Sequence, residues 1–281
     1  MTLSVNTNQP ALIALQNLNK TNDEMEGVQS RINTGLAISS AKDNAAIWSI
    51  AQDQRADRAA LNAVKMSLDR ATSITDVALA AGESVSDLLT QMREKVVAAK
   101  DTSLSTSSRT ALNADFQGLL KNLTQVVNSA TFDGANIING SGSVTFNMTF
   151  LADADAATVI TLKLQNLSLS STINSLVATD AINTQTLAAS VLARLDATMT
   201  RVNQAVGSIG SQAKQIEAHN TFISKLNDVL ETGVGNLVDA DMAKESARLQ
   251  ALQVKQQLGA QALSIANQAP QIILSLFNGG G

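Results

Sequence analysis

The side chains that most often perform chemistry in proteins are scarce in this sequence. The chain of 281 residues contains no Cys and a single His, His219. The absence of Cys excludes disulfides, thiol catalysis and thiolate metal sites. One His is too few for a His-rich zinc or iron site, or for an HExxH metalloprotease helix. No partner constellation accompanies His219, so we interpret it as a polar residue within a helix-packing register.

Three other segments contain suggestive residue types but lack the required pattern. Gly207-Ser-Ile-Gly210 lacks the spacing and the Lys-Ser/Thr of a phosphate loop. Asp153 and Asp155 are similar to the start of a calcium loop, but no Gly or distal Glu follows at the right offsets, so a solvated hairpin tip is favoured. Trp48 follows Ile47 in an apolar patch, where packing is the favoured interpretation and a partner contact the alternative. The sequence therefore predicts a protein that is not an enzyme and has no cofactor or metal site.

Composition favours long helices that pack closely on one another. Apolar residues make up 44% of the chain, but aromatic residues make up only 2%, unlike the walls of most cofactor pockets. The two prolines, Pro10 and Pro270, lie near the ends and leave the stretch between them free of helix breakers. The net charge of −4 gives no basic footprint for nucleic acid. We expect neither a secretory signal in the first residues nor a membrane span. Taken alone, the absence of both would indicate a cytoplasmic protein.

Heptad spacing dominates two long stretches of the chain. Apolar residues recur at alternating steps of three and four between residues 61 and 99, and at every seventh residue between 195 and 230. We expect these stretches to form one antiparallel intrachain seam, with the second helix ending at Gly233-Val-Gly235. A polar break at residues 103–108 predicts that a further helix folds back on the first. The predicted seam residues are Leu61, Val64, Leu68, Val85, Leu89, Leu195, Val202, Ile209, Ile216, Ile223 and Leu230.

The middle of the chain changes from helical to period-two patterning. Turn residues occupy Phe132-Asp133-Gly134 and residues 139–142. Alternating apolar residues then predict two strands joined as a hairpin across residues 152–157. These are Val144, Phe146, Met148, Phe150, Ile160, Leu162 and Leu164. The predicted fold class is thus mainly α, a long antiparallel helical bundle or coiled coil formed by the N- and C-terminal halves, with a small β-hairpin region in the middle.

The terminal segments carry apolar residues on more faces than a monomer needs. The last segment has two apolar stripes, and a helix of that kind requires neighbours on both sides. Its charges are balanced, as are those of the first segment, which argues against docking to nucleic acid or anionic lipid. We therefore expect these inner helices to form a subunit interface. The predicted interface residues are Leu15, Leu18, Met25, Ile32, Leu249, Leu252, Val254, Leu258, Leu263, Ile265 and Ile272.

Both ends of the chain resemble the signatures of a known family. Residues 31–46 resemble the N-terminal signature of bacterial flagellins, and residues 239–250 and 266–277 resemble the C-terminal one. Residues 67–71 extend the resemblance, which covers most of 1–140 and 187–281. The chain departs from the pattern at Ala37, where flagellins often carry Arg, and at Ile47-Trp48, where Gly and a small aliphatic residue are usual.

The resemblance implies a structural subunit that polymerises into the helical flagellar filament used for swimming. A hook–filament junction protein of the same architecture is the alternative, and a cytoplasmic coiled-coil signalling protein is a third. It also implies a division into an inner domain (1–42 plus 239–281), a rod domain (43–131 plus 187–238) and a hairpin insert (132–186) that belongs with the rod.

The resemblance further implies the partners and surroundings of the chain. The partners would be other copies of the chain, alone or mixed with other flagellins, the flagellar type III export apparatus with an export chaperone, and the cap and hook-junction proteins. The chain would be extracellular, exported without a cleaved signal peptide. Many flagellins carry O-linked sugars, and the candidate positions here are Ser141, Ser143, Ser168, Ser170 and Thr172.

Overall fold

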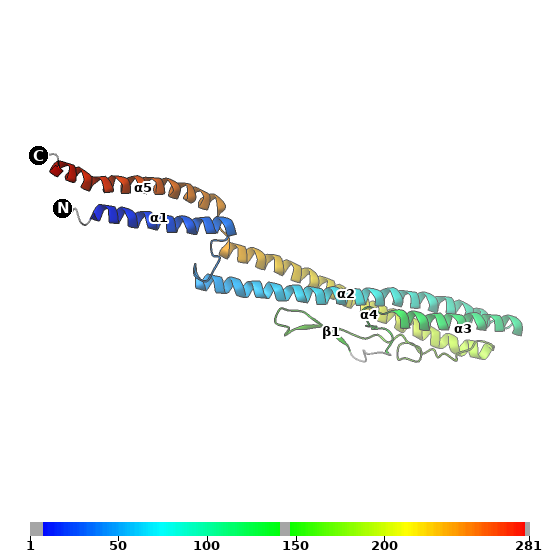
Figure 1. Cartoon of the computed structure of the whole chain (residues 1–281). Coiled ribbons are helices and arrows are strands. Elements are labelled where there is room, and N and C mark those ends of the chain that lie inside the picture. The colour runs from blue at the N-terminus through cyan, green and yellow to red at the C-terminus, as the bar shows by residue number, and fades with distance from the viewer. Residues whose placement is uncertain (1–7, 141–146, 279–281) are drawn as a thin grey trace. The chain divides into compact units, whose positions relative to one another are not determined.

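The computed structural model describes residues 8–140 and 147–278, without the side chains of 269–278. It confirms the predicted fold class: long helices dominate, and a small antiparallel hairpin interrupts them (Figure 1). None of the helices in these residues is long and apolar enough to cross a membrane. In chain order the elements are α1 (Gln9–Thr34), α2 (Ala45–Ala99), α3 (Thr106–Ser129), β1 (Met148–Leu151), β2 (Val159–Leu162), α4 (Gln185–Val238) and α5 (Met242–Asn278).

The chain divides into two compact units, and each is built from both halves of the sequence. Unit 1 comprises Met1–Ala56 and Leu230–Gly281, and unit 2 comprises Asp57–Val229. Helices α2 and α4 contribute residues to both units. The predicted domain boundaries at residues 42 and 239 refer to positions within an assembled filament. The structure of a single chain does not test them, so they stay a prediction.

In unit 1, local capping explains where α1 begins and ends. The Asn8 side chain accepts a hydrogen bond from the backbone N–H of Ala11 at 3.2 Å, and Pro10 lies in the first turn, where a missing N–H costs nothing. At the other end Gly35 adopts a left-handed φ of 71° and its N–H bonds to Arg31 O at 2.9 Å. A small core follows, in which Ala51, Val234 and Val238 are buried beneath Leu36, Ile38 and Ile47.

In unit 2, α2 and α4 run antiparallel with a constant register. Polar side chains pair across the two helices. From one pair to the next, the residue number on α2 increases by the same amount as the residue number on α4 decreases. The pairs are Asp69 with Asn220 (2.6 Å), Ser86 with Asn203 (3.0 Å) and Arg93 with Asp196 (2.7 Å). At Gly82 the helices approach so closely that an added Cβ would lie 2.8 Å from Val206 Cγ2. This geometry fits an antiparallel pair with interdigitating side chains.

The third helix of unit 2 folds back on α2, as the polar break predicts. Helix α3 begins within residues 103–108 because the Ser105 side chain accepts a hydrogen bond from the N–H of Ser108 at 3.1 Å. Arg109 donates to the carbonyls of Ala99 and Asp101, which no longer have helical partners at the end of α2. The side chain of Arg109 therefore ties the start of α3 to the end of α2 and to the turn that follows it.

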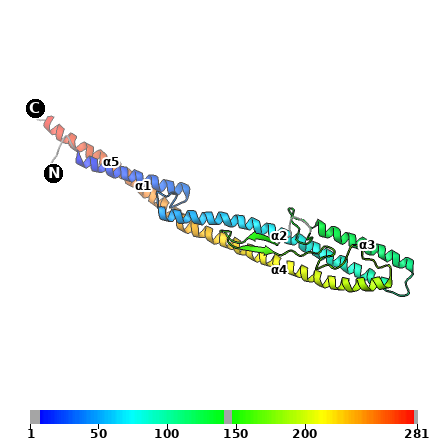
Figure 2. The same cartoon turned by 90° about the horizontal axis from the view of Figure 1, so that it is seen from below.

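The hairpin of unit 2 lies alongside α2 and α4 (Figure 2). Its register pairs Met148 with Leu162 and Leu151 with Val159. The period-two residues Phe150 and Leu162 are buried, as expected for one face of a strand pair. The predicted hairpin is confirmed, while Val144 and Phe146 lie outside the described residues.

One predicted helix boundary is wrong. Helix α4 does not end at Gly233-Val-Gly235 but continues to Val238. Val234 and Val238 are buried in the core of unit 1, so burial on one helical face offsets the helix penalty of two glycines, roughly 1 kcal/mol each.

Candidate assembly surfaces

In unit 1, α1 and α5 form a second antiparallel pair that side-chain bonds hold together along its length (Figure 1). The contacts are Asn8 Nδ2 to Ala266 O (2.7 Å), Gln256 Nε2 to Asn22 Oδ1 (2.8 Å) and Arg31 Nε to Glu245 Oε2 (3.1 Å). Glu245 lies in the first turn of α5, where a carboxylate also interacts favourably with the helix dipole. The pair is thus fixed in register by polar contacts rather than by a continuous apolar core.

The two apolar stripes of α5 have different environments. Leu252 is buried, and Leu249 and Leu263 on the same stripe are half-buried. The second stripe is open: Val254, Leu258 and Ile265 are 55%, 59% and 69% exposed. The side chain of Ile272, the last predicted member of this stripe, lies outside the described residues. The described residues of this second stripe of α5 are therefore all in contact with solvent.

Helix α1 shows the same division. Leu18, Met25 and Ile32 are half-buried, whereas Leu15 is 42% exposed. Leu12 and Ile13, which the sequence analysis did not select, are also exposed. The predicted heptad begins at Leu15. The sequence signal for Leu12 and Ile13 is that two large apolar residues stand next to each other shortly before it. Among the predicted interface residues whose side chains the structure describes, Leu15, Val254, Leu258 and Ile265 are the exposed ones.

The connections between the helices of unit 1 are fixed by local hydrogen bonds. Asp43 accepts from the N–H and hydroxyl groups of both Ser39 and Ser40, at 2.9 to 3.2 Å. These bonds favour the ionised form, and the pKa of Asp43 is lowered, chiefly by the Ser40 N–H. Ala37 N bonds to Val238 O at 2.7 Å, so this segment is tied to the end of α4.

The predicted seam residues lie inside unit 2 rather than on a surface. Ten of them are at most 2% exposed, and Leu230, which belongs to unit 1, is half-buried. The ten are Leu61, Val64, Leu68, Val85, Leu89, Leu195, Val202, Ile209, Ile216 and Ile223. Burying side chains of this size contributes about 1.5–3 kcal/mol each, so they supply much of the favourable energy of unit 2.

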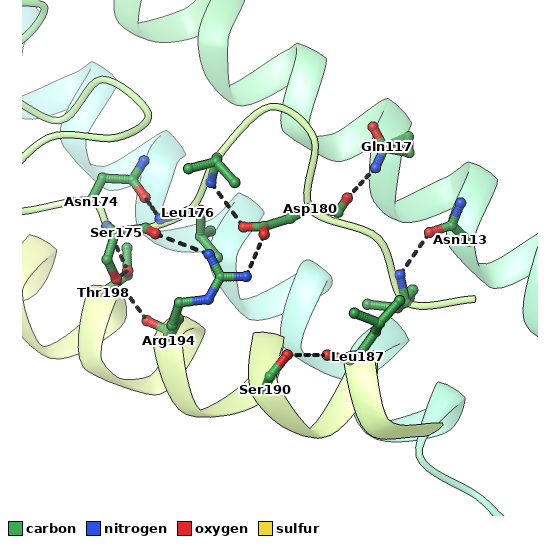
Figure 3. A network of polar contacts seen from close by, with 12 residues as sticks. Asn113, Gln117, Asn174, Ser175, Leu176, Asp180, Leu187, Ser190, Arg194 and Thr198 are labelled. Carbon is green, nitrogen blue, oxygen red and sulfur yellow. Dashed lines mark hydrogen bonds and ion pairs between the residues drawn. The ribbon is translucent and has the colours of Figure 1, made fainter. Parts of the chain in front are cut away.

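A polar network fastens the loop before α4 onto α3 and α4 (Figure 3). Asp180, which is buried, forms an ion pair with Arg194, and its other oxygen accepts from Val177 N at 2.8 Å. On the α3 side, Asn113 accepts from the backbone N–H of Ile182 at 2.7 Å. A buried carboxylate held by an ion pair and a backbone donor is fully satisfied, so the network fixes the loop rather than offering a site.

The candidate hydroxyls for sugar attachment differ in their availability. Ser168 donates to Asn139 O at 2.6 Å and is half-buried. Ser170 and Thr172 are exposed, and Ser170 has a φ of 60°, which marks it as part of a tight turn. Ser141 and Ser143 lie outside the described residues.

Two family models match the ends of the chain. The model of the bacterial flagellin N-terminal helical region matches residues 5–143, and that of the bacterial flagellin C-terminal helical region matches residues 192–277. These matches cover α1 to α3, most of α4, and α5 almost to its end.

Known proteins similar to this chain agree with the family models. Flagellin FljJ of Caulobacter vibrioides is 69% identical over 282 residues, which is 100% of both chains. A flagellin of Brucella melitensis is 36% identical over 282 residues, covering 98% of this chain and 99% of that one. Among solved structures, a putative flagellar hook-associated protein from Vibrio parahaemolyticus covers 70% of this chain and 100% of its own, with a TM-score of 0.57. At 13% identity, that similarity concerns the fold alone.

Proposed function

The chain belongs to the bacterial flagellin family and is a structural, non-enzymatic subunit of the flagellar filament, and from this premise we propose that α1 and α5 form its principal assembly surface. The observation that carries the proposal is the open stripe of α5: Val254, Leu258 and Ile265 are more than half exposed. A row of large apolar side chains on a helix is stabilised when a neighbour covers it, and a filament supplies neighbours.

The pairing of α1 with α5 supports coupled ordering and assembly. Within the described part of these two helices, Thr21, Val28 and Leu252 are the buried residues. Helices with so little buried area are marginal in water, and most helical stability in proteins comes from packing an apolar face. We expect both helices to be largely disordered in the free subunit and to order as copies join, as segments that fold on binding do.

The symmetry of the contact follows from the two kinds of stripe on α5. The stripe containing Leu252 faces α1 of the same chain, and we propose that the open stripe meets a different surface on the next copy. Such a contact is heterologous, and a heterologous contact whose rotation does not close a ring propagates as a helical filament, as the proposed function requires.

A hook–filament junction protein of the same architecture is the alternative function. The similarity to the Vibrio parahaemolyticus hook-associated protein concerns the fold and does not favour that role. The identity of 69% over the full length to a flagellin favours the filament subunit. Copy number in purified filaments distinguishes the two, because a junction protein is present in few copies and a filament subunit in very many.

The location in the extracellular filament follows from the family. We also propose that the chain leaves the cell through the flagellar type III apparatus with a chaperone, without cleavage, and assembles between junction and cap proteins. The family resemblance supports this route. Intact-mass measurement of subunits from native filaments tests the absence of cleavage, because a cleaved leader would shorten the N-terminus.

Sugar attachment, where it occurs, is proposed at Ser170 or Thr172 rather than Ser168. Both are exposed, whereas the Ser168 hydroxyl already donates a hydrogen bond to Asn139 O. Peptide mapping of native filaments decides this, and modification of Ser168 would contradict it.

The assembly proposal is tested by removing α5. Deleting residues 240–281 should leave a soluble, helical unit 2, since the seam lies within Asp57–Val229, but should abolish filament formation. Circular dichroism measures the helix content, and electron microscopy with sedimentation measures assembly. Filaments formed by the truncated chain would contradict the proposal. A triple Ser substitution at Val254, Leu258 and Ile265 in the full chain should also prevent assembly without changing the melting of unit 2.

A further inference from the structure

The segment that connects β2 to α4 has no regular secondary structure, yet it is packed into unit 2. It comprises residues 165–184, which we call the strap. Its first residues bond to the backbone that precedes the hairpin, Gln165 N to Ile137 O at 2.8 Å and Leu167 N to Ile138 O at 2.7 Å. Large apolar side chains of the strap are fully buried, namely those of Leu167, Leu176 and Ile182. The strap is therefore a wall of the core and not a surface loop.

The one charged residue of the strap lies in this core. It is Asp180, whose side chain is 6% exposed. A carboxylate is seldom buried to this degree unless a partner is present. Arg194 of α4 forms an ion pair with it, and Val177 N donates to the second carboxylate oxygen at 2.8 Å. Figure 3 shows that Asp180 is fastened to both helices, since Gln117 of α3 donates to its backbone oxygen. Without Arg194 the closed strap would hold an unpaired charge in the core.

Two further buried polar side chains hold the middle of the strap. Asn174 Nδ2 donates to Leu167 O at 3.1 Å, within the strap. The hydroxyls of Thr198 on α4 and Ser175 on the strap lie 3.0 Å apart. Asn174 and Thr198 are both 0% exposed. A buried network is costly when only part of it is paired, so we expect the strap to open as a whole rather than residue by residue.

We propose that the strap opens as a local unit while the seam of α2 and α4 stays folded, and that the Asp180–Arg194 pair is the latch that holds it closed. The number of buried apolar side chains supports this order of opening. The strap buries three large ones, whereas ten predicted seam residues are buried in unit 2. Free energies of opening range from near zero to that of global unfolding, and a segment with the smaller core opens first.

The latch has a consequence for a subunit that works outside the cell. A protease cleaves an extended segment that has left the core, at a rate that follows the population of the open form when opening and closing are fast. The strap contains no Lys or Arg, so trypsin-like enzymes find no site in it, but its leucines suit enzymes that cleave beside apolar residues. The latch therefore sets how long the free subunit survives such proteases.

A conservative change in the seam tests whether the strap opens by itself. The free subunit is treated with thermolysin, which cleaves before apolar residues, and mass spectrometry identifies cuts within residues 165–184. Ile216→Val should speed amide exchange in the seam about two- to tenfold, because a buried methyl group is lost. It should leave cleavage of the strap unchanged, because the open and closed forms share the same seam. A rise in strap cleavage by the same factor would overturn the proposal, since the strap would then open only with the whole unit.

A change in the latch should have a larger effect. Arg194→Met leaves the Asp180 carboxylate unpaired and should speed cleavage in the strap about a hundredfold. Seam amides should also exchange faster, since the closed form is destabilised, but should stay slower than strap amides by the same factor as in the unmodified chain. Asp180→Asn in the same chain removes the buried charge and should slow the cleavage again by about tenfold or more. Arg93→Met, in the exposed ion pair of Arg93 with Asp196, is the matched control and should change cleavage by less than about twofold.

The remaining outcomes decide between the latch and simpler explanations. Cleavage that stays fast in the double variant would overturn the latch, because lost packing of the Arg194 stem would then explain the result. Equal exchange of strap and seam amides in the unmodified chain would overturn the proposal without any substitution, which covers the case that Arg194→Met does not fold. None of these measurements uses filaments, so their failure would leave the assembly proposal intact, and filaments formed without α5 would leave the latch intact.

Discussion

The two antiparallel helix pairs of this protein have similar sequence patterns and opposite burial. Between α2 and α4, ten of the predicted seam positions are at most 2% exposed. Between α1 and α5, most of the predicted apolar positions are half-buried or exposed, and polar bonds such as that of Gln256 with Asn22 hold the register. A heptad pattern thus predicts that a helix packs against something. It does not say whether that partner is in the same chain.

A second apolar stripe on a helix therefore carries information about assembly. In unit 2, the seam residues of α4 are buried against α2, and the hairpin bonds to α4 at His219 and Gln212 within the same chain. In unit 1, α5 has one stripe for α1 and another, containing Leu258 and Ile265, that no described residue covers. We therefore expect unit 2 to be stable before assembly and α1 with α5 to gain stability when copies join.

The largest expected effect is in hydrogen exchange of the free subunit. Amides of α1 and α5 should exchange nearly as fast as in an unfolded chain, because these helices bury little area. Amides at the seam should exchange more slowly than those of α1 and α5 by a factor of about 10³ or more. This is expected for a core whose amides exchange only when the whole unit unfolds. Mass spectrometry of proteolytic fragments gives both rates. Assembly should slow exchange in α1 and α5, and equal protection of the two pairs in the monomer would remove the contrast.

The next effect compares a buried with an exposed isoleucine. Ile216→Asp places a charge without a partner in the seam and should destabilise unit 2 by about 3–5 kcal/mol. Ile265→Asp, on the open stripe, should change the melting of the monomer by less than about 0.5 kcal/mol yet block assembly. Thermal melting by circular dichroism measures both. If the two variants melted alike, the assignment of core and surface would be wrong.

Most of the architecture could be predicted because it depends on regular spacing. Apolar residues every three and four positions predicted α2 and α4 as an antiparallel pair, and alternation at Phe150 and Leu162 predicted the hairpin. The end of α4 could not be predicted, since Gly233 and Gly235 are helix breakers locally and only tertiary burial of Val234 and Val238 keeps the helix intact.

The surfaces were harder to predict than the fold. The sequence identified both stripes of α5, but periodicity alone could not say which of them α1 would cover. The hydrogen bond of Ser168 to Asn139 O joins residues far apart in the chain, so it could not be foreseen from local sequence.

A smaller effect concerns glycines inside the helices of unit 2. A Cβ at Gly118 or Gly207 would meet nothing within 4 Å, so each change to Ala should stabilise unit 2 by about 0.5–1 kcal/mol. Gly82→Ala is the matched control and should destabilise, because its Cβ would lie 2.8 Å from Val206 Cγ2. Melting of all three variants measures this. Exchange rates in α1 and α5 should not change, and a parallel gain there would mean that the two helix pairs are not energetically separate.

The smallest effect concerns acid and the hairpin tip of unit 2. Asp153 accepts hydrogen bonds from the Thr158 hydroxyl at 2.7 Å and from the N–H groups of Ala157 and Thr158, and its pKa is lowered from 3.8, first by that hydroxyl. A carboxylate with a lowered pKa stabilises the fold above its unfolded value, and this contribution is lost as the pH falls below 3.8 through the folded pKa. The tip should therefore loosen in that window while the seam, which is apolar, does not respond. Amide exchange at Ala157 and Thr158, followed by NMR from pH 5 to about pH 2, measures the change. Asp153→Asn should remove the pH dependence and Asp155→Asn, whose side chain accepts none of these bonds, should preserve it. A tip that responds identically in both variants would place the acid-sensitive group elsewhere.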